Sequence, residues 1–235
     1  PSSLLNIPYL GSLNLESNDL ATGSIPSWLG NMPSLYELNL GNNNFTGEIP
    51  SGFENFTSLS SLNLHGNQLS GTIPAWIGNY EEFYHLDLSE NNFSGNVPAS
   101  FSNLRYMTYL NLRGNDLNGD IAAWIRNMTD LYHLDLSSNE FTEEIPSEIG
   151  YMGSLEFLDL GWNQFTGNIP SSLGYVETLT HIYLWGNQLS GEIPSEFNHL
   201  ENLVTLELYG NQLTGEIPTW LGDLTNLSCL DLGLN

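Results

Sequence analysis

The stretch that decides the fold runs from residue 59 to residue 74 and reads Leu59-Ser-Ser-Leu62-Asn-Leu64-His-Gly-Asn67-Gln-Leu69-Ser-Gly71-Thr-Ile73-Pro74. Leucines alternate with other residues between Leu62 and Leu64, which is the period of a short strand with one buried face. The same pattern returns along the whole chain: leucine-type residues at places one, four, six and eleven, asparagine at nine, glycine at thirteen and Ile-Pro at fifteen and sixteen. The chain is therefore an array of similar units.

Asparagine marks the period of this array, with one step of 25 residues followed by eight of 24. The recurring residues are Asn18, Asn43, Asn67, Asn91, Asn115, Asn139, Asn163, Asn187, Asn211 and Asn235. Nine full units begin at Leu10, Leu35, Leu59, Phe83, Met107, Leu131, Leu155, Leu179 and Leu203, with partial units at residues 1–9 and 227–235. The first unit carries one extra residue between Leu20 and Gly23. We expect one repeat domain over residues 1–235.

The composition of the unit predicts how it folds. One short strand per unit pairs in parallel with its neighbours, and the recurring amide stands where the chain leaves that strand. Stacked amides form a ladder that satisfies buried backbone groups. The segment after the Ile-Pro pair has inward residues three apart, which suits a 3₁₀ or α turn. Because no unit buries its leucine face alone, stacking must create one continuous core.

The whole chain resembles the plant-type leucine-rich repeat, L-x-x-L-x-L-x-x-N-x-L-x-G-x-I-P-x-x-L-G-x-L-x-x. The resemblance implies an α/β solenoid, a right-handed superhelix with a parallel sheet on the concave side. It further implies a short second sheet beside the first, with 3₁₀ or α turns on the convex side. Ala122 replaces the proline of the fifth unit and Glu143 the glycine of the sixth, and we expect both to loosen the convex edge locally.

The resemblance also implies capping units with paired cysteines, whereas this sequence has no caps and only Cys229. One interpretation is that residues 1–235 are a window of a longer protein. The alternative is that open ends dock end to end into a filament.

The charge balance excludes whole classes of partner. The chain carries 27 Asp and Glu against 3 Lys and Arg, a formal charge of −24. Because nucleic-acid affinity comes largely from basic side chains that displace counterions, we expect no nucleic-acid partner. No apolar run approaches the roughly 20 residues of a membrane span, so we expect no membrane contact within this segment.

The outward places of the predicted strands define a candidate binding surface. Places three, five, seven and eight of units four to nine combine aromatic rings, imidazoles and carboxylates, which packing alone does not require. The candidate ligand-binding residues are His85, Asp87, Tyr109, His133, Asp135, Phe157, Trp162, His181, Tyr183, Trp185 and Tyr209. Such a surface suits a peptide, a protein or a glycan. The alternative is that the rings only shield the sheet and pair across strands.

Metal binding and catalysis have weaker support. His85 with Asp87 and His133 with Asp135 point to one side, but the two pairs lie about 9–10 Å apart, too far to share an ion. We expect solvated His–Asp contacts and no metal or other cofactor. No nucleophile motif, zinc motif or phosphate loop is present, so we expect no enzyme activity.

Five Asn-x-Ser/Thr sequons avoid the concave strands, and they start at Asn44, Asn55, Asn92, Asn127 and Asn226. Such sequons are acceptors for N-glycans in secreted proteins. A second set outside the strands is Trp28, Trp76, Trp124 and Trp220, which we expect to cover the convex flank.

The favoured hypothesis is an extracellular or cell-surface, non-enzymatic recognition module that binds a peptide, protein or glycan on its concave face. The alternative is a structural subunit of a glycosylated filament or surface layer that assembles with itself end to end. Ice binding ranks lower, because Asn14, Asn39 and Asn63 start a regular column that Asp87 interrupts. Inhibition of a cell-wall hydrolase is compatible by resemblance.

Overall fold

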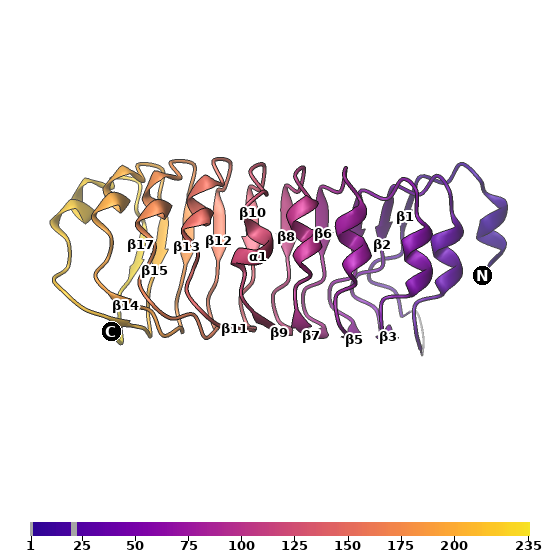
Figure 1. Cartoon of the computed structure of the whole chain (residues 1–235), viewed down its shortest axis with the longest axis horizontal. Helices are drawn as coiled ribbons and strands as arrows, with labels where there is room; N and C mark the ends of the chain where they lie inside the picture. Colours follow the sequence, from indigo (N-terminus) through magenta and orange to yellow (C-terminus); the bar gives the residue numbers. More distant parts are fainter. Residues whose placement is uncertain (1, 20–22) are drawn as a thin grey trace.

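The computed structural model describes residues 2–19 and 23–235, so the extra residue expected between Leu20 and Gly23 lies outside the described part. Within that part, ten short parallel strands form one sheet along the length of the molecule (Figure 1). They are β1 (Ser12–Asn14), β2 (Glu37–Asn39), β4 (Ser61–Asn63), β6 (His85–Asp87), β8 (Tyr109–Asn111), β10 (His133–Asp135), β12 (Phe157–Asp159), β13 (His181–Tyr183), β15 (Thr205–Glu207) and β17 (Cys229–Asp231). We call the solvent side of this sheet the concave face.

Equivalent places of neighbouring units face each other, because the strands pair in register. Leu62 pairs with Leu86, and Leu86 pairs with Leu110. These three side chains are fully buried, as is Leu64 at place six. Each buried leucine contributes about 1.5–3 kcal/mol through removal of apolar surface from water. The predicted leucine-rich-repeat solenoid is thereby confirmed.

The recurring asparagines form a continuous hydrogen-bond ladder. Nδ2 of Asn91 donates to the carbonyl oxygens of Leu64, Leu88 and Ser89 at 3.0, 3.2 and 3.0 Å. Its Oδ1 accepts the N–H of Leu69 at 3.0 Å. Leu64 and Leu69 belong to the preceding unit, so one amide joins two coils. An unsatisfied buried backbone group costs about 1–3 kcal/mol, which explains why the array keeps asparagine here.

A second set of strands lies beside the first sheet, along the lower edge in Figure 1. It consists of β3 (Thr46–Gly47), β5 (Gln68–Gly71), β7 (Asn92–Asn96), β9 (Asp116–Gly119) and β11 (Glu140–Phe141), with β14 (Ser190–Gly191) and β16 (Gln212–Leu213) as a separate pair. The five-stranded part ends at β11, beside Glu143. Only isolated bridges, such as Glu144 with Thr166, continue it there. Backbone hydrogen bonds still cross this point, from Gln164 N–H to Phe141 O and from Thr166 N–H to Glu143 O, both at 2.8 Å. The expected loosening of the convex edge at Glu143 stays a prediction.

The return segments form one short helix per coil on the side opposite the ten-stranded sheet. They are η1 (Ser2–Asn6), η2 (Ser27–Asn31), η3 (Ser51–Asn55), η4 (Ala75–Asn79), η5 (Ala99–Asn103), α1 (Ala122–Ile125), η6 (Ser147–Tyr151), η7 (Ser171–Tyr175), η8 (Ser195–His199) and η9 (Thr219–Asp223). Those labelled η are 3₁₀ turns. Proline precedes most of them, and its carbonyl accepts the first bond, as from Ile77 N–H to Pro74 O at 3.2 Å. Proline fits this place because it needs no N–H there.

The unit without proline is the one that adopts α geometry. A proline restricts the residue before it to extended conformations, and Ala122 imposes no such limit on Ile121, which is helical at φ −83° and ψ −18°. The N–H of Ala122 donates to Asp120 Oδ1 at 2.7 Å. Trp124 on this helix is fully buried. The expectation that Trp124 covers the convex flank is therefore wrong, whereas Trp28, Trp76 and Trp220 are half-buried. The expected loosening of the convex edge at Ala122 stays a prediction.

No helix among the described residues has the length and apolar character that a membrane crossing needs.

Candidate functional site

Four aromatic rings at place three form a continuous pile on the concave face. The ring centroids of His85 and Tyr109 lie 4.5 Å apart at 13°. Those of Tyr109 and His133, and of His133 and Phe157, lie 4.4 Å apart at 8°. Register explains the stacking, because strands about 4.8 Å apart hold equivalent side chains at ring-stacking distance. We call these four half-buried residues the ring stack; they pair across strands and still present their edges to solvent.

Beyond Phe157 the rings are farther apart and no longer parallel. Its ring lies 5.5 Å from that of Tyr183 at 47° and 6.0 Å from that of His181 at 36°. Nδ1 of His181 lies 2.8 Å from Thr180 Oγ1, which fixes the imidazole at the edge of its strand. The sequence-predicted rings from His85 to Tyr183 thus share one surface on five neighbouring strands.

Two tryptophans extend this surface beyond the ends of β12 and β13. The indoles of Trp162 and Trp185 meet edge to face, with ring centroids 5.4 Å apart at 76°. Trp162 is 59% exposed and has a φ of +48°, a rare conformation for a bulky residue. We call this pair the tryptophan corner. Tyr209, in contrast, contacts no ring of the stack or the corner within the described residues, and its ring lies against Gly233.

The aspartates at place five have a structural role that the sequence interpretation missed. Oδ1 of Asp87 accepts Ser89 N–H at 3.0 Å and Ser89 Oγ at 2.6 Å. Asp135 holds Ser137 in the same way, at 2.9 and 2.6 Å. Both aspartates are buried, so the expectation of solvated His–Asp contacts is wrong.

The same bond recurs in units with asparagine at place five, as from His65 N–H to Asn63 Oδ1 at 3.0 Å. It is an Asx turn that closes the strand. Asparagine or aspartate at this place in most units is the signal that could have revealed it. The amides of Asn14, Asn39 and Asn63, which we considered as an ice-binding column, are committed to these turns.

Two neighbouring aspartates stand at place five of the strands that carry the rings. Asp135 and Asp159 are register partners on β10 and β12, and both are buried. Burial, reinforced by Asp135, raises the pKa of Asp159 to about 7. Burial also raises the pKa of Asp135. The nearby Arg113 favours the charged form of both, but its Nε also donates to Glu90 Oε1 at 3.3 Å.

The imidazoles of the ring stack are neutral at pH 7. Burial lowers the pKa of His133 to about 4, although Asp87 opposes the shift. Burial also lowers the pKa of His85. Tyr183 stands between two carboxylates at place five: burial raises its pKa, and Glu207 and Asp159 raise it further, against a lowering hydrogen bond with Thr205. The concave face therefore combines uncharged rings with negative charge.

The five sequon asparagines are all exposed and lie outside the concave strands. Nδ2 of Asn127 donates to Ser102 O at 2.9 Å and Nδ2 of Asn226 to Glu201 O at 2.8 Å, so these side chains lie along the preceding coil.

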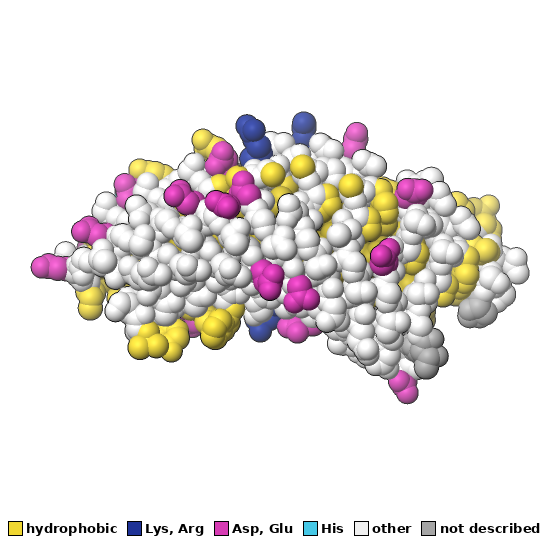
Figure 2. Space-filling view, turned by 60° about the horizontal axis from the view of Figure 1, so that its bottom comes forward, with side chains coloured by type: hydrophobic (Ala, Val, Ile, Leu, Met, Phe, Trp, Pro, Cys, Tyr) yellow, Lys and Arg dark blue, Asp and Glu magenta, His cyan; other side chains and the backbone are white. Residues whose placement is uncertain are grey.

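Figure 2, which brings the lower side of Figure 1 forward, shows mainly uncharged side chains with scattered carboxylates, and no histidine is visible there.

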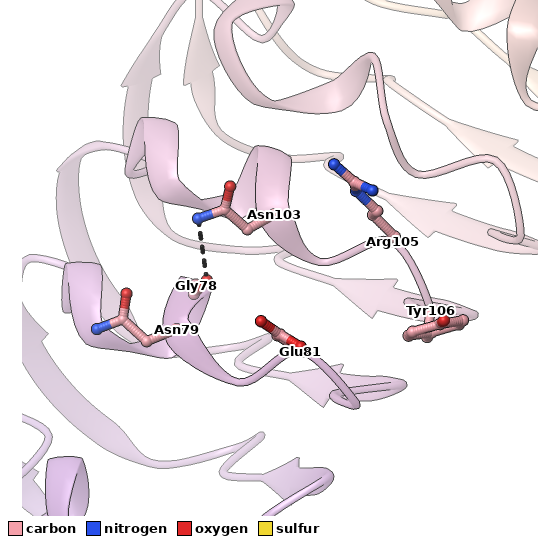
Figure 3. A pocket seen from close by; sticks show the side chains of 6 residues that line it. All are labelled: Gly78, Asn79, Glu81, Asn103, Arg105 and Tyr106. Atoms are coloured by element: carbon pink, nitrogen blue, oxygen red, sulfur yellow. Dashed lines mark hydrogen bonds between the residues drawn. The ribbon is translucent and has the colours of Figure 1, made fainter.

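A rival candidate is the hollow of about 500 Å³ between η4 and η5 (Figure 3). Asn103 Nδ2 donates to Gly78 O at 3.3 Å across it, and Glu81, Arg105 and Tyr106 project around its rim. Only two coils contribute to this hollow, whereas the rings of the concave face span five strands. The concave face is therefore the better candidate.

No group of three or more His, Cys, Asp or Glu side chains in the described part of the chain is placed to hold a metal ion.

Family models place the chain among known proteins. One model described as leucine rich repeat matches residues 8–69 and 177–235, a second matches residues 83–104, 130–152 and 154–176, and a third matches residues 103–123. Together with the stacked coils and the amide ladder, these matches define the class. The chain belongs to the leucine-rich-repeat family. A comparison with curated protein sequences gives no match.

Solved structures resemble the whole chain. A TDR receptor is 31% identical with a TM-score of 0.93, over 100% of this chain and 41% of that one. The Arabidopsis receptor kinase HAESA, in complex with the peptide hormone IDA and the co-receptor SERK1, is 37% identical with a TM-score of 0.89, over 99% and 43%. A plant ice-binding protein is 27% identical with a TM-score of 0.83, over 97% and 75%. The chain thus spans less than half of the two receptor chains.

Proposed function

We propose that this chain is an extracellular, non-enzymatic recognition module that binds a peptide along its concave face. The observation that carries the proposal is the surface formed by the ring stack and the tryptophan corner. Large aromatic side chains with exposed edges dominate the energetics of recognition surfaces, and packing of the repeat does not require them at outward places. The similarity to HAESA, whose solved complex contains a peptide hormone, supports a peptide as ligand.

The extracellular location is supported by the five exposed sequons and by the similarity to receptor structures. Glycans at these asparagines would leave the concave face open to a ligand. Expression in a eukaryotic secretory host, followed by enzymatic removal of N-glycans and mass spectrometry, tests the sites one by one. Occupancy at Asn55 and Asn127 would support the proposal, and five unmodified sequons in secreted protein would contradict this part of it.

The binding surface is tested with an array of random peptides and a triple variant, Tyr109→Ala, Phe157→Ala and Trp185→Ala. Peptides that bind the native chain should lose at least tenfold in affinity for the variant. The melting temperature should fall by only a few degrees, because each stacked pair contributes roughly 0.2–1 kcal/mol. The matched control is Tyr151→Ala, which removes a 69% exposed tyrosine from η6 on the opposite side. Unchanged affinity for the triple variant would refute the site.

A further inference from the structure

The tryptophan corner is held in place by two glycines. A Cβ on Gly161 would lie 2.7 Å from Nε1 of Trp185, and a Cβ on Gly186 would lie 3.3 Å from the ring of Trp162. Each indole therefore rests on the glycine of the neighbouring unit, and the seating is reciprocal. Both indoles retain solvent access, and Trp162 is 59% exposed. The two indoles, held at an angle of 76°, form a preorganised aromatic surface. Among the described residues, no side chain covers its solvent side.

Carboxylates adjoin this surface. Oδ1 of Asp159 accepts the N–H of Gly161 at 2.8 Å, so the same glycine contacts the carboxylate and the indole of Trp185. Register then places Tyr183 beside Asp159 and Glu207 beside Tyr183. The corner thus combines two indole faces with acidic groups on adjacent strands.

The chain itself supplies almost no cation to balance this charge. It has three basic residues against 27 acidic ones and contains no lysine. On the concave face, Arg113 donates to Glu90. A cationic ligand would therefore meet complementary charge on this face and little competition from basic side chains of the chain itself.

We propose that the tryptophan corner is the subsite for a positively charged side chain, arginine or lysine, of the peptide that the concave face binds. The inference rests on the proposed function and names the chemistry of its ligand. A cation over an indole face is attracted by the ring quadrupole, and tryptophan is the strongest such partner. A guanidinium also stacks on an aromatic plane while it donates to carboxylates. The half-buried Glu207 supplies an acceptor, whereas Asp159 is buried and already accepts the Gly161 N–H.

The test uses the peptide Ac-Arg-Gly-Arg-NH2 and its citrulline counterpart, which keeps the shape but lacks the charge. Indole N–H signals in ¹H–¹⁵N spectra report the binding, and single tryptophan variants assign them. The arginine peptide should shift the signals of Trp162 and Trp185 in a saturable way, and the citrulline peptide should bind at least tenfold more weakly. Added salt should weaken the binding of the arginine peptide and leave the binding of the citrulline peptide unchanged.

Two variants locate the effect. Trp185→Leu should abolish the saturable shift of Trp162. Gly161→Ala should weaken binding at least fivefold with both indoles still present, because the new methyl group displaces Trp185. Trp220→Leu on η9 is the matched control and should bind like the native chain. Equal binding of the two peptides, or no shift of either indole signal, would overturn the cationic subsite. Indole shifts caused by cellohexaose and not by the arginine peptide would overturn it as well.

The peptide array separates this inference from the proposed function. Bound peptides that are neutral or acidic, and that still need Tyr109 and Phe157, would overturn the cationic subsite and leave peptide recognition standing. An array without any binder that depends on these rings would overturn the proposed function itself.

Discussion

At the scale of single residues, Asp159 both closes its strand through a hydrogen bond and makes the stability of the chain depend on pH. Asp159 must accept the Gly161 N–H to close its strand, and this role holds the carboxyl where it is buried beside Asp135. Its pKa of about 7 exceeds the value of about 3.9 for an unfolded chain. The folded chain therefore binds more protons between these pH values. The contribution of this group to stability is fully present below about pH 4 and is lost as the pH rises through 7.

Asp159→Asn should consequently stabilise the chain at high pH only. Asparagine makes the same turn in the fifth unit, where Asn111 Oδ1 accepts Arg113 N–H at 3.1 Å. We expect a gain of about 2–4 kcal/mol at pH 8, or a rise of roughly 4–16 °C in melting temperature, and no gain near pH 4. Thermal unfolding at both pH values measures this. An equal change at pH 4 and pH 8 would show that the charge is not the cause.

Glu143 stores backbone strain. Its φ of +68° falls in the left-handed region, where glycine stands in the other units, as at Gly167 with φ +73°. Glu143→Gly should remove the strain and raise the unfolding free energy by about 0.5–1 kcal/mol. The matched control is Glu144→Gly, at a residue without positive φ, which should be neutral or destabilising. A lower melting temperature for Glu143→Gly than for this control would contradict the interpretation.

At the scale of the element, α1 shows that a local departure is compensated by its surroundings. Asp120 accepts the Ala122 N–H that a proline would lack, and helical Ile121 places Trp124 in the core beside Phe101, with ring centroids 6.4 Å apart. The hydrogen bond needs the N–H of residue 122, and proline at that position would also forbid the helical conformation of Ile121. A substitution that restores the usual sequence should therefore harm this unit.

Ala122→Pro should lower the unfolding free energy by about 1–3 kcal/mol, because it forbids helical Ile121 and removes the bond to Asp120. Denaturant unfolding measures the loss, and near-UV circular dichroism reports the displacement of Trp124. Ala122→Ser keeps the N–H and should be nearly neutral. The account of α1 fails if the proline variant is as stable as the native chain.

At the scale of the whole molecule, the sequence predicts what repeats and misses what occurs once. The leucine period and the recurring asparagines predict the strands, their register and the core, because the same residues recur at the same places in every unit. Among the outward places only place five repeats, with asparagine or aspartate in most units. The burial of Asp159 and the contacts of the two indoles with Gly161 and Gly186 depend on the neighbouring coils and do not follow from that pattern. The sequence pattern places Trp124 on the convex flank, but this residue lies in the one unit where Ala122 replaces proline and the turn is α-helical, and its side chain is fully buried.

The sequence predicts which residues share the ring surface and offers pairing of the rings across strands as an alternative; it does not predict the stacking distances or the burial. Histidines and aromatics at place three indicate a shared surface, since equivalent places align on adjacent strands. That these rings stack, and that burial keeps His133 neutral, follows from strand spacing and from desolvation. From the sequence alone, His85 and His133 are expected to contact Asp87 and Asp135 instead.

The central claim, that the concave rings receive the ligand, is tested most directly by hydroxyl-radical footprinting with a peptide selected on the array. Aromatic side chains react with the radical in proportion to their exposure, so mass spectrometry reads the contact surface residue by residue. We predict protection of Tyr109, Phe157, Trp162 and Trp185 in the complex and an unchanged rate at Tyr151 and Tyr175 on the convex helices. Protection of Tyr151 and Tyr175 with unchanged rates at the four concave rings would contradict the account.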